Sequence, residues 1–357
     1  MGLRGWIARL GLVLAGALLP LLLLEIVLRV VDAPVEVFNP LHGFHVGDAR
    51  LGWKGKPDVA RRFRKLQFDA WVEHDASGFR RPDPPPSDSA SEQVLVLGDS
   101  YAWGWGVSQG EVVTDRLQRA VAPKLAIHNR GVVGFGTGQE YLLLADELAR
   151  RRYTEVIVLF CVNDLTDNID QRDHRPLFAL QDGRPVVTNL PLPERLQGRV
   201  ADWIDEHSRA ASFLSYQLAL LKERRRGRAP DDESPAPVAP GAAVDPGTLP
   251  GREVTRALLV AMSDLGRAAG AELSVVYVPA PEDVRDDLGG TYVDAVRAMV
   301  EETCRTAGIP FLDLAPRFRA RAAEGAALFI PRDGHWSAAG HALAAEVIQE
   351  SVLRPRP

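Results

Sequence analysis

A serine that directly follows a short apolar run is the strongest chemical feature of the chain. The run Val94–Leu97 leads into Gly98-Asp99-Ser100, and glycines and a helical pattern come after it. Open α/β sheets place their reactive groups at the carboxyl ends of strands. Ser100 is therefore a candidate nucleophile. The alternative is a glycine turn in which Asp99 and Ser100 only cap the following helix.

A serine hydroxyl needs a base before it becomes a good nucleophile. Of the eight histidines, His335 has the most suitable context, because Asp333 lies two residues before it and Trp336 follows it. A triad carboxylate orients the imidazole through its second nitrogen, and Asp333 can do this from the same loop. Asp313, at the end of the last expected strand, is the alternative orienting carboxylate.

An acyl-transfer site also needs donors for the oxyanion, and two more strand ends offer them. Gly134 lies in a glycine-rich loop after the second expected strand, and Asn163 ends the third. Each alone also fits a turn or a helix cap. Trp103 and Trp105, just beyond the nucleophile, are candidate substrate contacts, although packing is an equal alternative for both.

Alternating strands and helices must position these residues. Apolar runs predict strands over 94–97, 124–129, 155–162, 272–278 and 309–314. Helical patterns cover 109–121, 137–151, 252–269, 291–307 and 337–353. This alternation predicts an α/β three-layer sandwich with a central parallel sheet of about five strands and helices on both faces.

Two regions interrupt this pattern. Residues 34–91 form a lead-in segment without clear periodicity. The domain itself is expected over 92–353, with an insertion at 165–250 over one edge of the sheet. That insertion contains a hairpin signal at 178–188 with Asp-Gly at its turn, a helix over about 195–226, and a Pro-rich linker at about 229–250 that we expect to be disordered.

The N-terminus predicts a membrane anchor. Residues 1–9 contain Arg4 and Arg9 and no acid, and an apolar run extends from Leu10 to Leu24 and, less strictly, to Val31. About 22 such residues can cross a bilayer. We interpret 1–33 as a cytoplasmic stub and single-pass signal anchor; cleavage after Ala33 is the alternative. Both place the rest of the chain outside the cytoplasm, in the periplasm or on the cell surface.

Composition narrows the function classes. A net charge of -5 and a pI near 6.0 argue against nucleic acid as a partner. Cys161 and Cys304 fall in apolar patterns and are expected to be free, buried residues without metal-binding spacing. No metal or other cofactor is expected, and the oligomeric state is left open.

The four blocks together resemble the SGNH hydrolase family, the GDSL-like esterases and acylhydrolases. The resemblance covers about residues 92–168 and 252–350 and assigns the name's four residues to Ser100, Gly134, Asn163 and His335. It implies a flavodoxin-like sandwich, an acyl-serine mechanism, and an oxyanion hole formed by the Ser100 N–H, the Gly134 N–H and the Asn163 side chain.

Two departures from the family pattern refine this resemblance. Tyr101 follows the serine where leucine is usual, and only Gly334 separates Asp333 from His335. The Asp-x-His-Trp order resembles the branch that includes polysaccharide O-acetylation proteins. We therefore expect a serine esterase or O-acyltransferase acting on an ester substrate, with O-acetyl groups of an exported or envelope glycan favoured. A lipase or thioesterase, or a non-catalytic scaffold, is the alternative.

Overall fold

The computed structural model describes residues 3–32, 43–87, 90–170, 174–193, 203, 207–226, 244–284 and 291–353. The chain divides into two compact units. One consists of residues 1–43, 64–66 and 195–232, and the other of residues 44–63, 67–194 and 233–357. All candidate site residues belong to the second unit.

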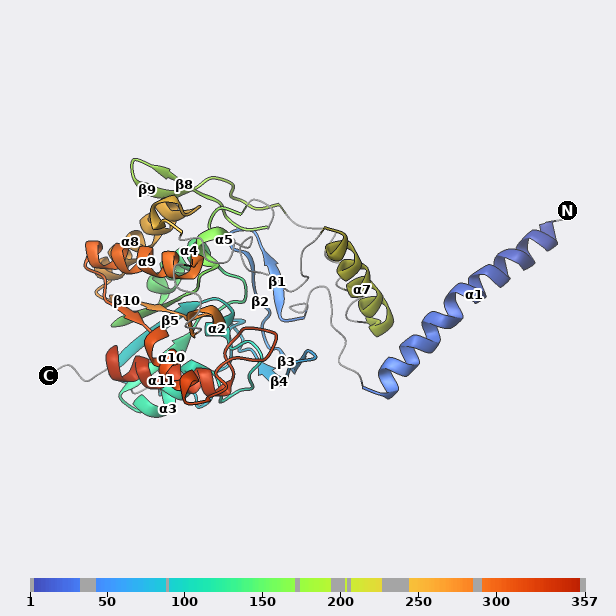
Figure 1. The fold of residues 1–357 in the computed structure, drawn as a ribbon, viewed down its shortest axis with the longest axis horizontal. Helices are drawn as coiled ribbons and strands as arrows, with labels where there is room; N and C mark the ends of the chain where they lie inside the picture. The colour runs from blue at the N-terminus through green and yellow to red at the C-terminus, as the bar shows by residue number, and fades with distance from the viewer. Residues whose placement is uncertain are drawn as a thin grey trace. The chain divides into compact units, whose positions relative to one another are not determined.

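The second unit is built around a five-stranded parallel sheet (Figure 1). Its strands, in spatial order, are β11 (Phe311–Asp313), β10 (Glu272–Tyr277), β7 (Glu155–Phe160), β5 (Glu92–Gly98) and β6 (Leu125–Asn129). Within this sheet the chain starts at β5, adds β6 on one side, and then adds β7, β10 and β11 in turn on the other side. This is a doubly wound arrangement, and its switch point lies beside β5. The predicted α/β fold with five parallel strands is confirmed.

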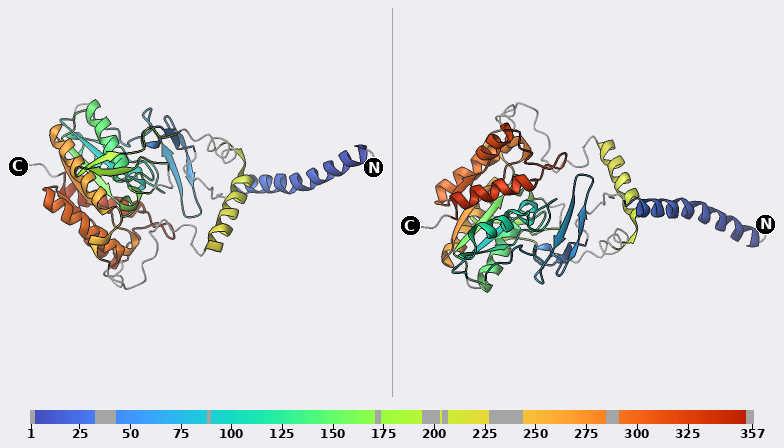
Figure 2. Two further views of the ribbon diagram at one scale, coloured as in Figure 1. Left: turned by 90° about the horizontal axis from the view of Figure 1, so that it is seen from above. Right: turned by 90° about the horizontal axis from the view of Figure 1, so that it is seen from below.

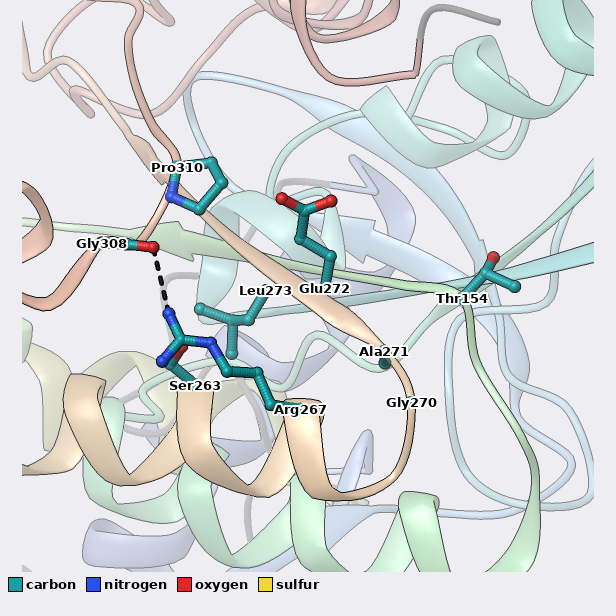
Figure 3. Close-up of a pocket in the computed structure, with 9 residues that line it drawn as sticks. All are labelled: Thr154, Ser263, Arg267, Gly270, Ala271, Glu272, Leu273, Gly308 and Pro310. Atoms are coloured by element: carbon teal, nitrogen blue, oxygen red, sulfur yellow. Dashed lines mark hydrogen bonds between the residues drawn. The ribbon is translucent and has the colours of Figure 1, made fainter. Parts of the chain in front are cut away.

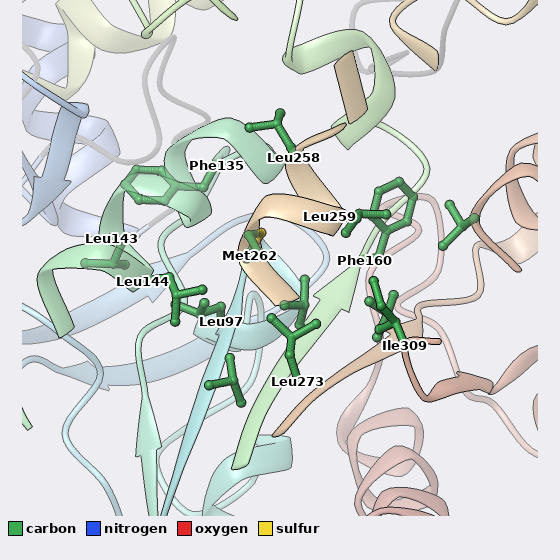
Figure 4. Close-up of a cluster of buried hydrophobic side chains, with 14 of the residues drawn as sticks. Leu97, Phe135, Leu143, Leu144, Phe160, Leu258, Leu259, Met262, Leu273 and Ile309 are labelled. Atoms are coloured by element: carbon green, nitrogen blue, oxygen red, sulfur yellow. The ribbon is translucent and has the colours of Figure 1, made fainter. Parts of the chain in front are cut away.

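Both faces of this sheet are buried, which explains why its strands are apolar throughout. In β5, Leu95 and Leu97 point into one core, and Val94 and Val96 into the other. Figure 4 shows part of the first core, where Leu97 lies near side chains of the covering helices. Side chains of successive residues point to opposite faces, so a strand with no polar face must be covered twice.

Helices provide the two covers. The helices over the first core are α4 (Thr137–Arg150), α8 (Arg252–Ala268) and α9 (Tyr292–Ala307). Those over the second are α3 (Val113–Val121), α10 (Ala315–Ala323) and α11 (Ala338–Ser351). Figure 1 shows the two groups on opposite sides of the sheet. Local signals set the boundaries: Thr291 and Asp294 form a capping box at the start of α9, and Ser337 caps α11. The helix α10 was not predicted.

The lead-in segment contains four short strands that periodicity did not reveal. They are β1 (His45–Asp48), β2 (Gly52–Gly55), β3 (Ala60–Arg64) and β4 (Asp69–Glu73), paired as two antiparallel hairpins. Strands of four or five residues contain too few repeats for alternation to be recognised. The β1–β2 hairpin, blue in Figure 2, contacts α4, because Gln139 Nε2 donates to Leu51 O.

The insertion is partly described. It contains α5 (Asp164–Asp167), the hairpin of β8 (Phe178–Gln181) and β9 (Arg184–Val187), and a 3₁₀ turn, η1 (Pro246–Thr248). The predicted hairpin packs on α8 and α4, outside a helix layer and not over a sheet edge. Of the expected disordered linker, residues 229–243 lie outside the described part, whereas 244–250 are ordered and Leu249 is buried.

The first unit contains α1 (Leu3–Val30) and α7 (Arg209–Arg226). Of the expected helix over 195–226, residues 195–202 and 204–206 are outside the described part. Within α1, Gly11–Val30 is long and apolar enough to cross a membrane, and it is the one such helix among the described residues. A signal sequence and an anchor both have this property. Glu25 and Arg29, four residues apart on this helix, form an ion pair.

Candidate active site

The turn after β5 presents Ser100 at the carboxyl edge of the sheet. Gly98 has φ +154°, and a Cβ there would lie 2.8 Å from the Ala102 Cβ, so the strand can meet the helix this closely only with glycine. Asp99 caps the short helix α2 (Ser100–Trp103) by accepting from the Tyr101 N–H at 3.0 Å. As the first residue of that helix, Ser100 has an N–H without an intrahelical acceptor.

His335 reaches Ser100 from the loop before α11. Its Nε2 lies 2.8 Å from Ser100 Oγ, and its Nδ1 lies 2.7 Å from Asp333 Oδ1. When Nδ1–H donates to the carboxylate, Nε2 is left to accept the serine proton. Gly334, with φ +91°, provides the turn that brings the two side chains together.

Asp313, the alternative carboxylate, has a different environment. Its Oδ1 accepts from the Ala315 N–H at 2.9 Å at the start of α10, and its Oδ2 lies 3.9 Å from Arg297 Nε. Burial raises its pKa. Asp313 thus accepts from the first N–H of α10 and lies beside an arginine, and it is Asp333 that contacts the His335 ring.

The two expected oxyanion donors follow the strands on either side of β5. Gly134, after β6, has φ +74°, a conformation that favours glycine. Asn163 is the third residue after β7, and its Nδ2 donates to Asp167 Oδ2 at 3.0 Å. Burial raises the pKa of Asp99 to about 6, while a hydrogen bond from Asn163 opposes this rise. Asn163 therefore lies against the residue that precedes the nucleophile.

Two residues that sequence reasoning missed brace these donors. Trp53, from β2, donates its indole N–H to Val133 O at 2.9 Å, next to Gly134. Arg175, from the insertion, lies 3.3 Å from Asp167 Oδ2 and stacks over the Trp53 ring at 5.3 Å. Both come from segments without a recognisable pattern.

The two tryptophans after the nucleophile have different surroundings. Trp103 is 1% exposed and donates its indole N–H to His74 Nε2 at 2.9 Å. Burial lowers the pKa of His74 to about 4, so this ring is neutral and can accept. The surroundings of Trp103 thus match packing, the alternative to a substrate contact, because the side chain is enclosed in the core. Trp105 is also buried, and its indole Nε1 lies 3.1 Å from Asp333 Oδ2.

In the part of the chain that the structure describes, no group of His, Cys, Asp or Glu side chains could hold a metal ion. Cys161 and Cys304 are free and buried, as predicted. His341 lies in the core, where its Nδ1 accepts from the Val113 N–H, and burial lowers its pKa to about 3.

A pocket at the opposite edge of the sheet is separate from these residues. Figure 3 shows Thr154, Glu272 and Pro310 around it, all at the amino ends of strands. Arg267 crosses it to donate to Gly308 O at 3.0 Å. This pocket is thus partly filled by an arginine that caps α9, at the edge remote from Ser100.

Comparison with known proteins gives one family match. The model of the GDSL-like Lipase/Acylhydrolase family matches residues 96–343. None of the curated proteins compared with the chain matches it. A solved member of the lipolytic protein G-D-S-L family from Veillonella parvula is 12% identical, with a TM-score of 0.42 over 74% of this chain and 99% of that one. Esterase EstA from Pseudoalteromonas sp. is 12% identical, with a TM-score of 0.40 over 74% and 97%.

Proposed function

This chain belongs to the GDSL-like lipase/acylhydrolase family and is an SGNH-type hydrolase acting on ester bonds, and we propose that Ser100 is its acyl-carrying nucleophile. One observation supports this most strongly. A continuous hydrogen-bonded line runs from Ser100 Oγ to His335 at 2.8 Å and from His335 to Asp333 at 2.7 Å. That line contains a nucleophile, its base and the group that orients the base.

The reaction begins when the Ser100 hydroxyl proton moves to His335 Nε2 and Oγ attacks the ester carbonyl carbon. The carbonyl oxygen becomes an oxyanion, which the Ser100 N–H and the Gly134 N–H stabilise. One Asn163 Nδ2–H turns from its carboxylate partner to the oxyanion and becomes the third donor. His335 then gives its proton to the leaving alcohol oxygen as the carbon–oxygen bond breaks. The acyl group is now bound to Ser100 Oγ.

In the second half, water or an acceptor hydroxyl attacks the acyl-serine carbonyl. His335 takes the proton of the attacking oxygen and returns a proton to Ser100 Oγ as the acyl group leaves. Asp333 keeps the ring in the productive tautomer and stabilises the imidazolium in both halves. Water gives an esterase, and a sugar hydroxyl gives an O-acyltransferase.

We infer that the substrate is an O-acetyl ester of an envelope or exported glycan. The support is the Asp333-Gly334-His335-Trp336 order, which resembles the polysaccharide O-acetylation branch. The apolar helix α1 is consistent with a location at the membrane, with the catalytic unit outside the cytoplasm. A lipase or thioesterase is the competing function. A lipase would prefer long acyl chains, and a thioesterase would prefer a sulfur ester to an oxygen ester.

Turnover of p-nitrophenyl esters by the full chain in detergent tests the proposal. Ser100→Ala should abolish turnover, whereas Ser263→Ala should retain it, because Ser263 is a buried serine beside the pocket at the other edge of the sheet. Activity falling steeply beyond acetyl, together with acetate release from an O-acetylated polysaccharide, supports the glycan substrate. Preference for long acyl chains or thioesters supports the alternative. Unchanged turnover in Ser100→Ala would refute the nucleophile.

A further inference from the structure

We propose that Trp105 is a positioning residue that holds the Asp333 carboxylate and the His335 ring in their reactive arrangement. This inference rests on the proposed roles of Ser100 and His335. It replaces the expectation that Trp105 contacts substrate. Trp105 acts through the triad and does not touch the reacting atoms.

The first support is the way the Asp333 carboxylate is shared between donors. Its Oδ1 accepts from His335 Nδ1 at 2.7 Å and from the His335 backbone N–H at 3.3 Å. Its Oδ2 accepts from Trp105 Nε1 at 3.1 Å. With a donor on each oxygen, the carboxylate plane is fixed and cannot rotate away from the imidazole. Hydrogen bonds to a charged acceptor are stronger than those between neutral groups.

The second support is the ring stack. The Trp105 and His335 ring centroids lie 4.9 Å apart with an interplanar angle of 22°. When His335 takes the proton of Ser100 it becomes a cation beside an indole face, and such faces attract cations. The stack therefore favours the protonated ring that forms in the transition state.

The third support is that Trp105 is itself fixed from two directions. Its backbone N–H donates to Ser100 O at 3.0 Å, which ties it to the nucleophile's turn. Its ring meets Phe63 edge-on at 4.8 Å and Phe68 at 6.1 Å. Trp105 thus contacts the nucleophile's backbone, the base and the carboxylate, and aromatic residues of the lead-in segment hold it there.

The test is a comparison of Trp105→Phe with Trp103→Phe in the full chain. Phe at 105 keeps an aromatic face and loses the N–H, so kcat should fall about 10- to 100-fold with KM changed by less than about twofold. Without the indole donor, Asp333 attracts the imidazolium proton more strongly. The acidic limb of the kcat/KM profile should therefore move to higher pH. Trp103→Phe loses a donor to His74 instead, and should leave that limb in place.

Combining Trp105→Phe with Asp333→Asn separates positioning from packing. If Trp105 acts through Asp333, the double variant should be about as slow as Asp333→Asn alone. If Trp105→Phe does not fold, the NMR resonance of the Trp105 indole proton in the unsubstituted chain reports on its contact with Asp333 instead. It should titrate with the acidic limb of the rate profile and move in Asp333→Asn.

Two outcomes would overturn the inference: an unchanged kcat in a folded Trp105→Phe, or additive losses in the double variant. An unchanged kcat together with a higher KM would restore the substrate-contact role. Ser100→Ala, measured in the same series, keeps the failures apart. Turnover in Ser100→Ala refutes the proposed function, whereas an inactive Ser100→Ala beside a normal Trp105→Phe refutes only the role of Trp105.

Discussion

The chain contains two aspartates that could orient the catalytic imidazole, and their contacts differ. Asp333 bonds the ring of His335, with a Trp105 donor on its other oxygen. Asp313 accepts from the first N–H of α10 and lies beside Arg297. A carboxylate that fixes the tautomer of a base affects the rate, and one that bonds the first N–H of a helix affects the free energy of unfolding.

Asp333→Asn should therefore lower kcat by about 10⁴ while changing the melting temperature little. Asp313→Asn should lower the melting temperature modestly and keep most turnover. The measurement is kcat and melting temperature of both variants on one ester. Normal turnover in Asp333→Asn together with a large loss in Asp313→Asn would transfer the role to Asp313.

For single residues, the sequence could predict a contact where the spacing along the chain alone determines it. Asp333 and His335 lie in one loop, so their contact followed from two residues of separation. Trp105 contacts Asp333 across 228 residues, and no local pattern reveals such a pair. The sequence left packing and substrate contact open for Trp103 for a related reason, because its partner His74 belongs to a lead-in segment whose strands were not recognised.

Among the secondary-structure elements, α4 carries a buried acid beneath the nucleophile's turn. Neither carboxyl oxygen of Glu140 has a hydrogen-bond partner among the described residues. Burial, with the nearby Asp99 carboxylate, raises the pKa of Glu140 well above its ordinary value of 4.5. The folded state therefore binds more protons than the unfolded state once the pH exceeds that value. Stability from this group is lost as the pH rises.

Glu140→Gln removes this titration, so the variant should gain stability relative to the unsubstituted chain as the pH rises from 5 to 7. The gain is at most about 1.4 kcal/mol per pH unit. Denaturant unfolding at several pH values measures it. Glu147→Gln is the matched control on the same helix: Glu147 accepts from Tyr153 and pairs with Arg130, so this variant should be destabilised. A pH-independent difference for Glu140→Gln would contradict the account.

The elements of the sandwich could be predicted because its strands are buried on both faces and its helices are long. Continuous apolar runs such as Val156–Phe160 stand out in sequence. The hairpins β1–β2 and β3–β4 do not stand out, because their strands have four or five residues and mix polar with apolar side chains. Their position depends on tertiary contacts such as Trp53 to Val133, which no window of sequence contains.

For the molecule as a whole, the helix α1 bears on where the catalytic unit operates. The helix α1 could be a retained anchor or a removable signal. Arg4 and Arg9 precede it without any acid, which favours a cytoplasmic N-terminus. We therefore expect a reporter fused after Pro357 to be active outside the cytoplasm, and the same reporter fused before Met1 to be inactive there.

The chain should also remain with membranes after a high-salt wash, because about 20 apolar residues bind the bilayer hydrophobically and salt screens only charges. Immunoblotting of washed membranes measures this. A soluble product that begins near Pro34 would mean cleavage instead of anchoring. A reporter active only in the cytoplasm would exclude both.

The central claim is that Ser100 is the nucleophile and that His335 activates it. Labelling with a fluorophosphonate, followed by peptide mass spectrometry, tests both parts at once without knowledge of the natural ester. We expect one adduct, on the peptide that contains Ser100, with labelling at least about 10³-fold slower in His335→Ala and absent in Ser100→Ala. Labelling of another residue, or a normal rate in His335→Ala, would contradict the account.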